Sequence, residues 1–96
     1  VIGGNPIKKS MRRLSFKAGV FEEAIALSKT NPDVFDKLMI LLRDVQRDPF
    51  KGIGKPEPLK YNLKGLWSRR ITQEHRLVYE VTQTEIIIIS CIGHYG

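Results

Sequence analysis

Several residue types that equip small proteins for chemistry are scarce in this chain. It has 96 residues and one cysteine, so it can form neither an intramolecular disulfide nor a cluster of thiolate metal ligands. Its two histidines have no acidic cluster beside them, which argues against a metal site. No apolar run approaches the roughly 20 residues of a membrane span, and no signal peptide is recognisable. We therefore expect a cytoplasmic protein without a membrane segment, metal or cofactor.

The length and composition predict one domain. An apolar fraction of 42% in 96 residues supports one compact core and is too small for two. Residues 1–10 contain glycine, asparagine and proline and show no periodicity, so we expect an N-terminal extension or a remnant of expression. The folded domain is expected over residues 11–96.

Positive charge is concentrated in one part of the chain. The net charge of +6 favours polyanionic partners, with nucleic acid first among them. Residues 11–50 hold seven basic and six acidic residues, whereas residues 51–76 hold seven basic residues against only Glu57 and Glu74. Because most charge excesses are simply solvated faces, this segment alone leaves nucleic-acid binding open.

A short strand and a first helix are predicted at the start of the domain. The alternation over Arg13–Phe16 is typical of a strand. Phe21, Ala24 and Ile25 then fall at helical spacing, so we expect an amphipathic helix that buries these three residues and ends around Thr30.

A second helix has clear start and stop signals. Asn31 is a good N-cap, Pro32 suits the first helical position, and Asp48-Pro49 closes the helix. An apolar stripe indicates its buried face: Phe35, Leu38, Leu42 and Val45.

The C-terminal half predicts a loop followed by a sheet. Glycines and prolines over residues 50–58 favour a loop. Lys60–Leu63 is a candidate short strand, and three longer strands are predicted at Leu66–Thr72, His75–Thr82 and Glu85–Ile92, with the isoleucine-rich strand central. The fold class is α+β, with the N-terminal strand and two helices packed on one face of an antiparallel sheet. Alternation places Leu77, Tyr79 and Val81 on one side of the sheet and Arg76, Val78 and Glu80 on the other. If the first set faces the helices, Arg76 lies on the open face.

The residues required for metal-independent RNA cleavage are all present. Attack of a ribose 2′-hydroxyl on the neighbouring phosphate needs a base, an acid for the leaving 5′-oxygen, and positive charge for the phosphorane. Glu57 between two prolines is the candidate base and His94 the candidate acid, with charge supplied by Arg76, Lys60 and Arg70. Taken singly, Glu57 could be a solvated carboxylate, and His94 could belong to a frayed C-terminus.

The aromatic residues and the second histidine are less informative. Trp67, Tyr79 and Tyr61 could stack on bases, although a single tryptophan in a small domain more often lies in a core or interface. His75 heads a predicted strand and is more often structural. Cys91 lies in an apolar run and is expected to be a buried, inert thiol.

Several motifs together resemble one known family. Lys55–Lys60 (KPEPLK), Gly65–Thr72 (GLWSRRIT), Glu74–Tyr79 (EHRLVY) and the ending His94-Tyr95 are similar to the signature of YoeB/Txe toxins in the RelE superfamily. The resemblance covers residues 11–95 and is most specific from Pro49 onward. Residues 1–10 and Gly96 have no counterpart in the usual family pattern, and a residue after Tyr95 puts the geometry of the terminal carboxylate in doubt.

The resemblance implies both a fold and an activity. The fold would be similar to that of microbial ribonucleases, and the activity would be cleavage of messenger RNA in the ribosomal A site. Glu57 matches the family's general base, Arg76 the phosphate-binding arginine, His94 the general acid and Tyr95 a substrate-positioning tyrosine. The predicted RNA-phosphate contacts are Lys60, Arg70, Lys55 and Arg69.

The resemblance also implies partners. These are messenger RNA on the 70S ribosome, a YefM-like antitoxin whose tail folds onto the toxin, operator DNA through the antitoxin complex, and a second copy in a homodimer. We expect acidic antitoxin and RNA to compete for residues 51–76. The alternatives are a non-catalytic domain that binds nucleic acid and a gyrase-directed toxin of the same superfamily, but the joint presence of Glu57, Arg76 and His94 favours the ribonuclease.

Overall fold

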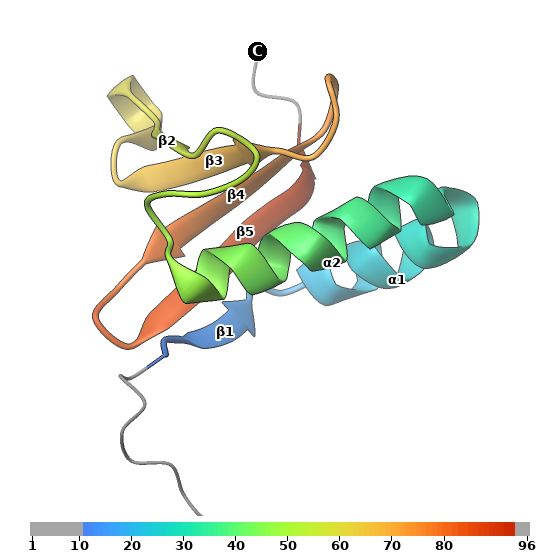
Figure 1. The fold of residues 1–96 in the computed structure, drawn as a ribbon, viewed down its shortest axis with the longest axis horizontal. Helices are drawn as coiled ribbons and strands as arrows, with labels where there is room; N and C mark the ends of the chain where they lie inside the picture. The colour runs from blue at the N-terminus through green and yellow to red at the C-terminus, as the bar shows by residue number, and fades with distance from the viewer. Residues whose placement is uncertain (1–10, 94–96) are drawn as a thin grey trace, which may run out of the picture.

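The computed structural model describes residues 11–93, so the predicted extension at 1–10 and the residues His94, Tyr95 and Gly96 lie outside the described part. Two helices lie against one mixed sheet (Figure 1). In chain order the elements are β1 (Arg13–Phe16), α1 (Val20–Thr30), α2 (Pro32–Arg47), β2 (Glu57–Pro58), a 3-10 helix (Tyr61–Leu63), β3 (Leu66–Arg70), β4 (Arg76–Val81) and β5 (Glu85–Gly93). None of the helices within residues 11–93 is long and apolar enough to cross a bilayer.

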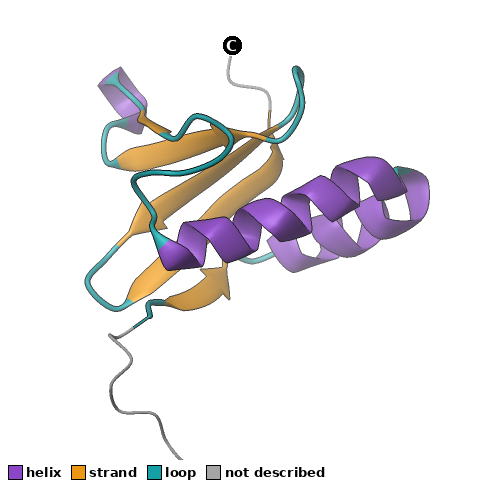
Figure 2. Cartoon of the chain, in the orientation of Figure 1, coloured by secondary structure: helices purple, strands orange, loops and turns teal. Residues whose placement is uncertain are grey.

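The sheet has the order β1-β5-β4-β3-β2 (Figure 2). Strands β3 to β5 form the predicted antiparallel meander, and the isoleucine-rich β5 lies between β1 and β4 as expected. The segment predicted as a loop over residues 50–58 ends in a short strand, β2, which pairs with β3 in antiparallel. The expectation of a wholly antiparallel sheet was wrong for β1, which pairs with β5 in parallel from Arg13 opposite Glu85 to Phe16 opposite Ile88. The reversals of the meander return β5 to the side of β1 in the same direction, so the final pairing is parallel.

The core lies between the helices and one face of the sheet. Leu77 and Tyr79 of β4 are fully buried in it, as alternation predicted, together with Ile86 and Ile88 of β5. The expected α+β class with helices on one face is therefore confirmed. The outward-alternating residues of β3 and β4 lie on the opposite, open face, where Arg70 and Glu80 are exposed but Ser68 and Val78 are fully buried.

Helix α2 follows its sequence signals closely. The Val34 N–H donates to the side-chain oxygen of Asn31 at 3.4 Å, and Pro32 occupies the first turn. The helix ends at Arg47, immediately before Asp48-Pro49. Its core side includes the predicted Leu38, Leu42 and Val45.

Helix α1 is rotated relative to its predicted face. Val20, Ala24 and Leu27 are buried, whereas Phe21 and Ile25 remain 56% and 43% exposed. The helix has two apolar faces, and contact with α2 and β5 buries the face that holds Val20, Ala24 and Leu27.

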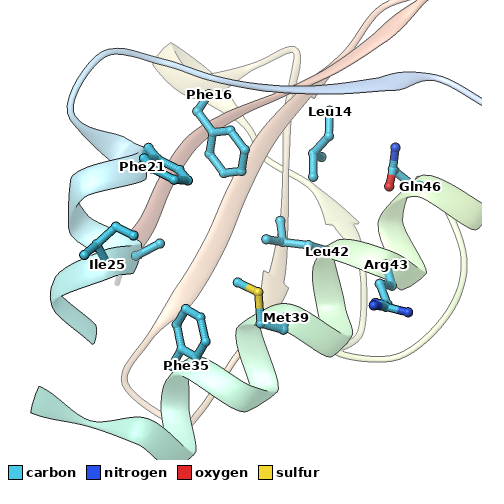
Figure 3. A pocket seen from close by; sticks show the side chains of 10 residues that line it. Leu14, Phe16, Phe21, Ile25, Phe35, Met39, Leu42, Arg43 and Gln46 are labelled. Carbon is cyan, nitrogen blue, oxygen red and sulfur yellow. The ribbon is translucent and has the colours of Figure 1, made fainter. Parts of the chain in front are cut away.

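The second apolar face of α1 borders a groove of about 310 Å³ (Figure 3). The side chains of Phe16 and Phe21 meet edge to face with ring centroids 5.9 Å apart. The groove is further lined by Leu14 of β1, by Ile25 of α1 and, from α2, by Phe35, Met39, Leu42, Arg43 and Gln46. An apolar groove open to solvent is a feature typical of a protein-binding surface.

The segment Lys60–Leu63 forms a 3-10 helix, so the strand proposed for it was wrong. Tyr61 has a positive φ of 57°, and the Leu63 N–H donates to the Lys60 carbonyl at 3.0 Å. Both features curl the backbone, and the segment leaves the sheet between β2 and β3.

Candidate active site

Strand register brings three predicted site residues to the open face of the sheet. Glu57 pairs with Ser68, which pairs with Val78, and Arg70 pairs with Arg76 in the next row. Directly paired residues share a face, as do residues two apart on one strand. Glu57, Arg70 and Arg76 therefore lie on one surface.

The C-terminal strand leads toward the same surface. On the other side of β4, Arg76 pairs with Gly93, the last described residue of β5. His94 and Tyr95 follow Gly93 directly in the sequence and lie outside the described residues. The structure thus places Gly93 beside Arg76, while the positions of His94 and Tyr95 stay predictions.

Glu57 is held by a very short edge strand. Pro56 and Pro58 flank it and fix their own backbone angles, while Leu59 N–H donates to the Leu66 carbonyl at 2.8 Å. Its side chain is exposed and enters no hydrogen bond or salt bridge within residues 11–93. The carboxylate is therefore open to solvent and to a ligand on this side of the sheet.

The open face carries positive charge that no acidic side chain of residues 11–93 neutralises. Arg70 is exposed and Arg76 partly buried, and neither guanidinium enters an ion pair in the described part of the chain. Two unpaired guanidinium groups on paired positions repel each other, and a phosphate between them would relieve that repulsion.

Ser68, beneath this face, is a feature that sequence reasoning missed. Its hydroxyl is fully buried and has no hydrogen-bond partner among the described residues. Buried hydroxyls are normally hydrogen-bonded. The Ser68 hydroxyl, on the residue paired with Glu57, therefore leaves one unused hydrogen-bonding group at the candidate site. A lone serine inside a strand gives no signal of this in the sequence.

Two predicted lysines flank Glu57 along the chain. Lys55 is exposed and has a left-handed backbone with φ 52°, which is uncommon for a lysine. Lys60 is exposed at the start of the 3-10 helix. Lys55 also lines a pocket with Arg70 and with Lys37 of α2, a residue that the sequence did not distinguish from other helix charges.

Arg69 does not contact RNA phosphate as predicted, because it is a completely buried structural residue. Its guanidinium donates to the Asp44 carboxylate at 2.5 Å and to the Tyr79 hydroxyl at 3.1 Å. It also donates to three carbonyls of the loop after α2, those of Asp48, Lys51 and Ile53. Alternation along β3 sends Arg70 outward and Arg69 inward.

The acidic partner of Arg69 is held ionised. Burial would raise the pKa of Asp44, but hydrogen bonds from Arg47, Arg69 and the Ile53 N–H outweigh it and lower the pKa. An ionised carboxylate is what a fully buried guanidinium requires for compensation.

Tyr79 and the partly buried Trp67 are structural residues on the helix-facing side of the sheet. Tyr79 is fully buried and donates to the Pro49 carbonyl at 2.7 Å, and burial raises its pKa, so base stacking by Tyr79 is wrong. Trp67 pairs with Tyr79 on the helix-facing side and packs on Phe50 with centroids 5.0 Å apart. Tyr61, 89% exposed, is still available for stacking.

The remaining polar candidates are structural too. His75 contacts the Thr72 hydroxyl through Nδ1 at 2.9 Å in the turn before β4. Burial, reinforced by Glu23, raises the pKa of Cys91 to about 12, which confirms the expected inert thiol. Residues 11–93 hold no group of three side chains suited to a metal ion.

Comparison with known proteins decides the family. Residues 16–95 match the profile of the YoeB-like toxin of bacterial type II toxin-antitoxin systems. The chain belongs to this YoeB-like toxin family. Toxin YoeB of Escherichia coli K12 is 48% identical over 75 residues, which are 78% of this chain and 89% of that toxin.

Solved structures agree with this membership. A YoeB dimer from Staphylococcus aureus is 40% identical, with a TM-score of 0.80. The match covers 90% of this chain and 100% of the other. A YoeB-YefM complex from the same organism is 42% identical with a TM-score of 0.78, covering 88% and 98%. The predicted recognition of a YoeB-type toxin is thereby confirmed.

Proposed function

We propose that this YoeB-like toxin is an endoribonuclease that cuts messenger RNA on the 70S ribosome and so inhibits translation. The observation that carries the proposal is the joint placement of Glu57, Arg70 and Arg76 on one sheet face. Gly93 lies opposite Arg76, and the terminal His94-Tyr95 follows it in the sequence. Work on the ribosome would locate the protein in the cytoplasm.

The proposed chemistry needs no metal. Glu57 removes the proton from the ribose 2′-hydroxyl, and the 2′-oxygen forms a bond to the adjacent phosphorus. Arg76 and Arg70, with Lys55 and Lys60 nearby, stabilise the charge that develops on the phosphorane. The bond from phosphorus to the 5′-oxygen then breaks as His94 protonates that oxygen, while Tyr95 positions the substrate. The products are a 2′,3′-cyclic phosphate and a 5′-hydroxyl.

The test is to map RNA ends on programmed ribosomes with and without the protein. Cuts bearing 2′,3′-cyclic phosphate and 5′-hydroxyl ends, formed equally well with chelator present, are expected. Fragments with 5′-phosphates would indicate attack by activated water and refute the mechanism. RNA binding without any cuts would favour the non-catalytic alternative, and inhibition of gyrase instead would favour the gyrase-directed one.

We further propose a YefM-like antitoxin as partner, because relatives form YoeB-YefM complexes. The apolar groove supports this, since a folding antitoxin tail needs apolar surface to bury. Next to the groove, β1 is an edge strand whose outer side can pair with another extended chain. The toxin-antitoxin complex, and not the toxin alone, would bind operator DNA. A second copy of the toxin is the alternative occupant of the groove, because a relative forms a dimer.

A further inference from the structure

A second basic feature lies around the end of β3. Lys37, Lys55 and Arg70 line a pocket of about 470 Å³ together with Gly54, Ile71, Thr72 and Gln73. The three cations come from α2, from the following loop and from β3. Residues that are distant in the sequence thus place positive charge around one hollow, and none of the described residues that line it is acidic.

The charge of this pocket is not neutralised within the protein. All three cationic side chains are exposed, and none enters a salt bridge within residues 11–93. The neighbouring acidic residues in sequence, Asp36 and Glu74, do not line the pocket. Gathering three like charges costs free energy, which a bound anion would offset.

The backbone is constrained so that Lys55 stays beside Arg70. The Arg70 N–H donates to the Gly54 carbonyl at 2.7 Å. A Cβ at Gly54, where φ is +82°, would lie 2.9 Å from Leu41 Cδ2 and 3.0 Å from the Arg70 carbonyl oxygen. Only glycine fits there, and Lys55 follows in an unusual left-handed conformation. Such uncommon backbone geometry is often retained where it serves a site.

The pocket is continuous with the candidate active site through Arg70. This residue lines the pocket and is also the cross-strand partner of Arg76. A guanidinium and two ammonium groups suit phosphate oxygens. An acidic peptide would need apolar anchors, but Ile71, the only large apolar residue of the lining, is 1% exposed.

We propose that Lys37, Lys55 and Arg70 form a second phosphate subsite, which holds the RNA backbone away from the scissile bond. The identity of the ligand rests on the proposed function. Lys37 is the new member: it lies on α2, outside the catalytic set, and extends the RNA path from the open sheet face around the end of β3.

The test measures binding of a 2′-O-methyl RNA oligonucleotide, which has no 2′-hydroxyl to attack, as a function of salt. Lys37→Gln should make the slope of log affinity against log salt shallower by about 0.7, the value for one lost single-strand phosphate contact. Lys29→Gln, at an exposed position of α1 outside the pocket, removes the same charge and should leave the slope unchanged.

Ribosomes without messenger RNA form the second arm. A slope change on the oligonucleotide assigns the phosphate to messenger RNA, and a change only on ribosomes assigns it to ribosomal RNA; both support the subsite. No change in either arm, no binding of the wild type, or an equal change in Lys29→Gln would overturn it. So would weakened binding of a poly-glutamate peptide alone, which would indicate an acidic protein partner. Because binding is measured without cleavage, a chain that cuts no RNA but shows the Lys37 effect refutes only the proposed function.

Discussion

Arg69 and Asp44 join the sheet to α2 through an ion pair whose guanidinium is fully buried. Arg69 Nη1 lies 2.5 Å from Asp44 Oδ2, and the same oxygen accepts the Ile53 N–H at 3.0 Å. Together the pair fixes the loop after α2, which runs into Lys55 and Glu57. The buried arginine thus acts on the candidate site indirectly, by positioning the segment that carries the proposed base.

Removing the buried guanidinium should destabilise the fold. Arg69→Met removes the buried cation that pairs with the Asp44 carboxylate and the side-chain donor to three loop carbonyls, which should lower the free energy of unfolding by about 3 kcal/mol. The neighbouring Arg70→Gln, exposed on the other face, should change it by less than about 0.5 kcal/mol. Urea unfolding measures both. Equal losses in the two variants would contradict the structural role of Arg69.

The same ion pair predicts acid sensitivity. The pKa of Asp44 is lowered in the folded protein from its ordinary 3.8, so the unfolded chain binds the proton more readily. The stabilisation is therefore fully present above pH 3.8 and is lost as the pH falls through the lower folded-state pKa. Unfolding followed between neutral and acid pH should show a smaller loss in Asp44→Asn than in wild type. A loss of the same size in both proteins would assign the acid sensitivity to other groups.

Arg76 should matter for cleavage more than for binding. If it stabilises charge that grows on the phosphorane, Arg76→Ala should slow single-turnover cleavage by about 10²-fold, with a much smaller effect on ribosome affinity. Lys29→Ala provides the control for lost positive charge. Weaker ribosome binding with an unchanged cleavage rate per bound complex would make Arg76 a docking residue instead.

The apolar groove should bind the antitoxin and take no part in catalysis. Ile25→Asp would place a charge against apolar groove residues and should weaken binding of a YefM-like antitoxin by at least about 30-fold, a loss typical of interface hot spots. Ile40→Asp is the control, because Ile40 is similarly exposed on α2 but lies outside the groove. Cleavage should persist in both. Wild-type antitoxin affinity for Ile25→Asp would exclude the groove as the binding surface.

The sequence predicted those features that depend on local chemistry. Asn31 and Pro32 defined the start of α2, and alternation over β4 put Tyr79 in the core with Arg76 on the open face. The face of α1 could not be settled, because Val20 and Leu27 offer an apolar stripe as good as Phe21 and Ile25. Packing against α2 and β5 made the choice.

Some positions in the candidate site also follow from local pattern, whereas others depend on contacts between distant segments. Alternation along β3 implies that Arg69 and Arg70 point to opposite faces, a signal that was available in the sequence and would have excluded one of them from RNA contact. The parallel pairing of β1 and the place of Lys37 beside Lys55 depend on contacts between distant segments. No local pattern encodes them.

The acid–base pair is the central prediction for the mechanism. Glu57→Gln and His94→Gln remove, respectively, the proposed base and acid and should each slow the chemical step by about 10²- to 10⁴-fold. Glu80→Gln is a matched control, since Glu80 is an exposed glutamate that shares the open face through its position two residues after Val78. Single-turnover cleavage on programmed ribosomes measures all three, and urea unfolding should show that Glu57→Gln keeps wild-type stability because its side chain is exposed. If Glu57→Gln and Glu80→Gln behaved alike, the effect would be one of charge alone. If both Glu57→Gln and His94→Gln cleaved at the wild-type rate, general acid–base catalysis by these residues would be refuted, and the basic sheet face would be left with a binding role.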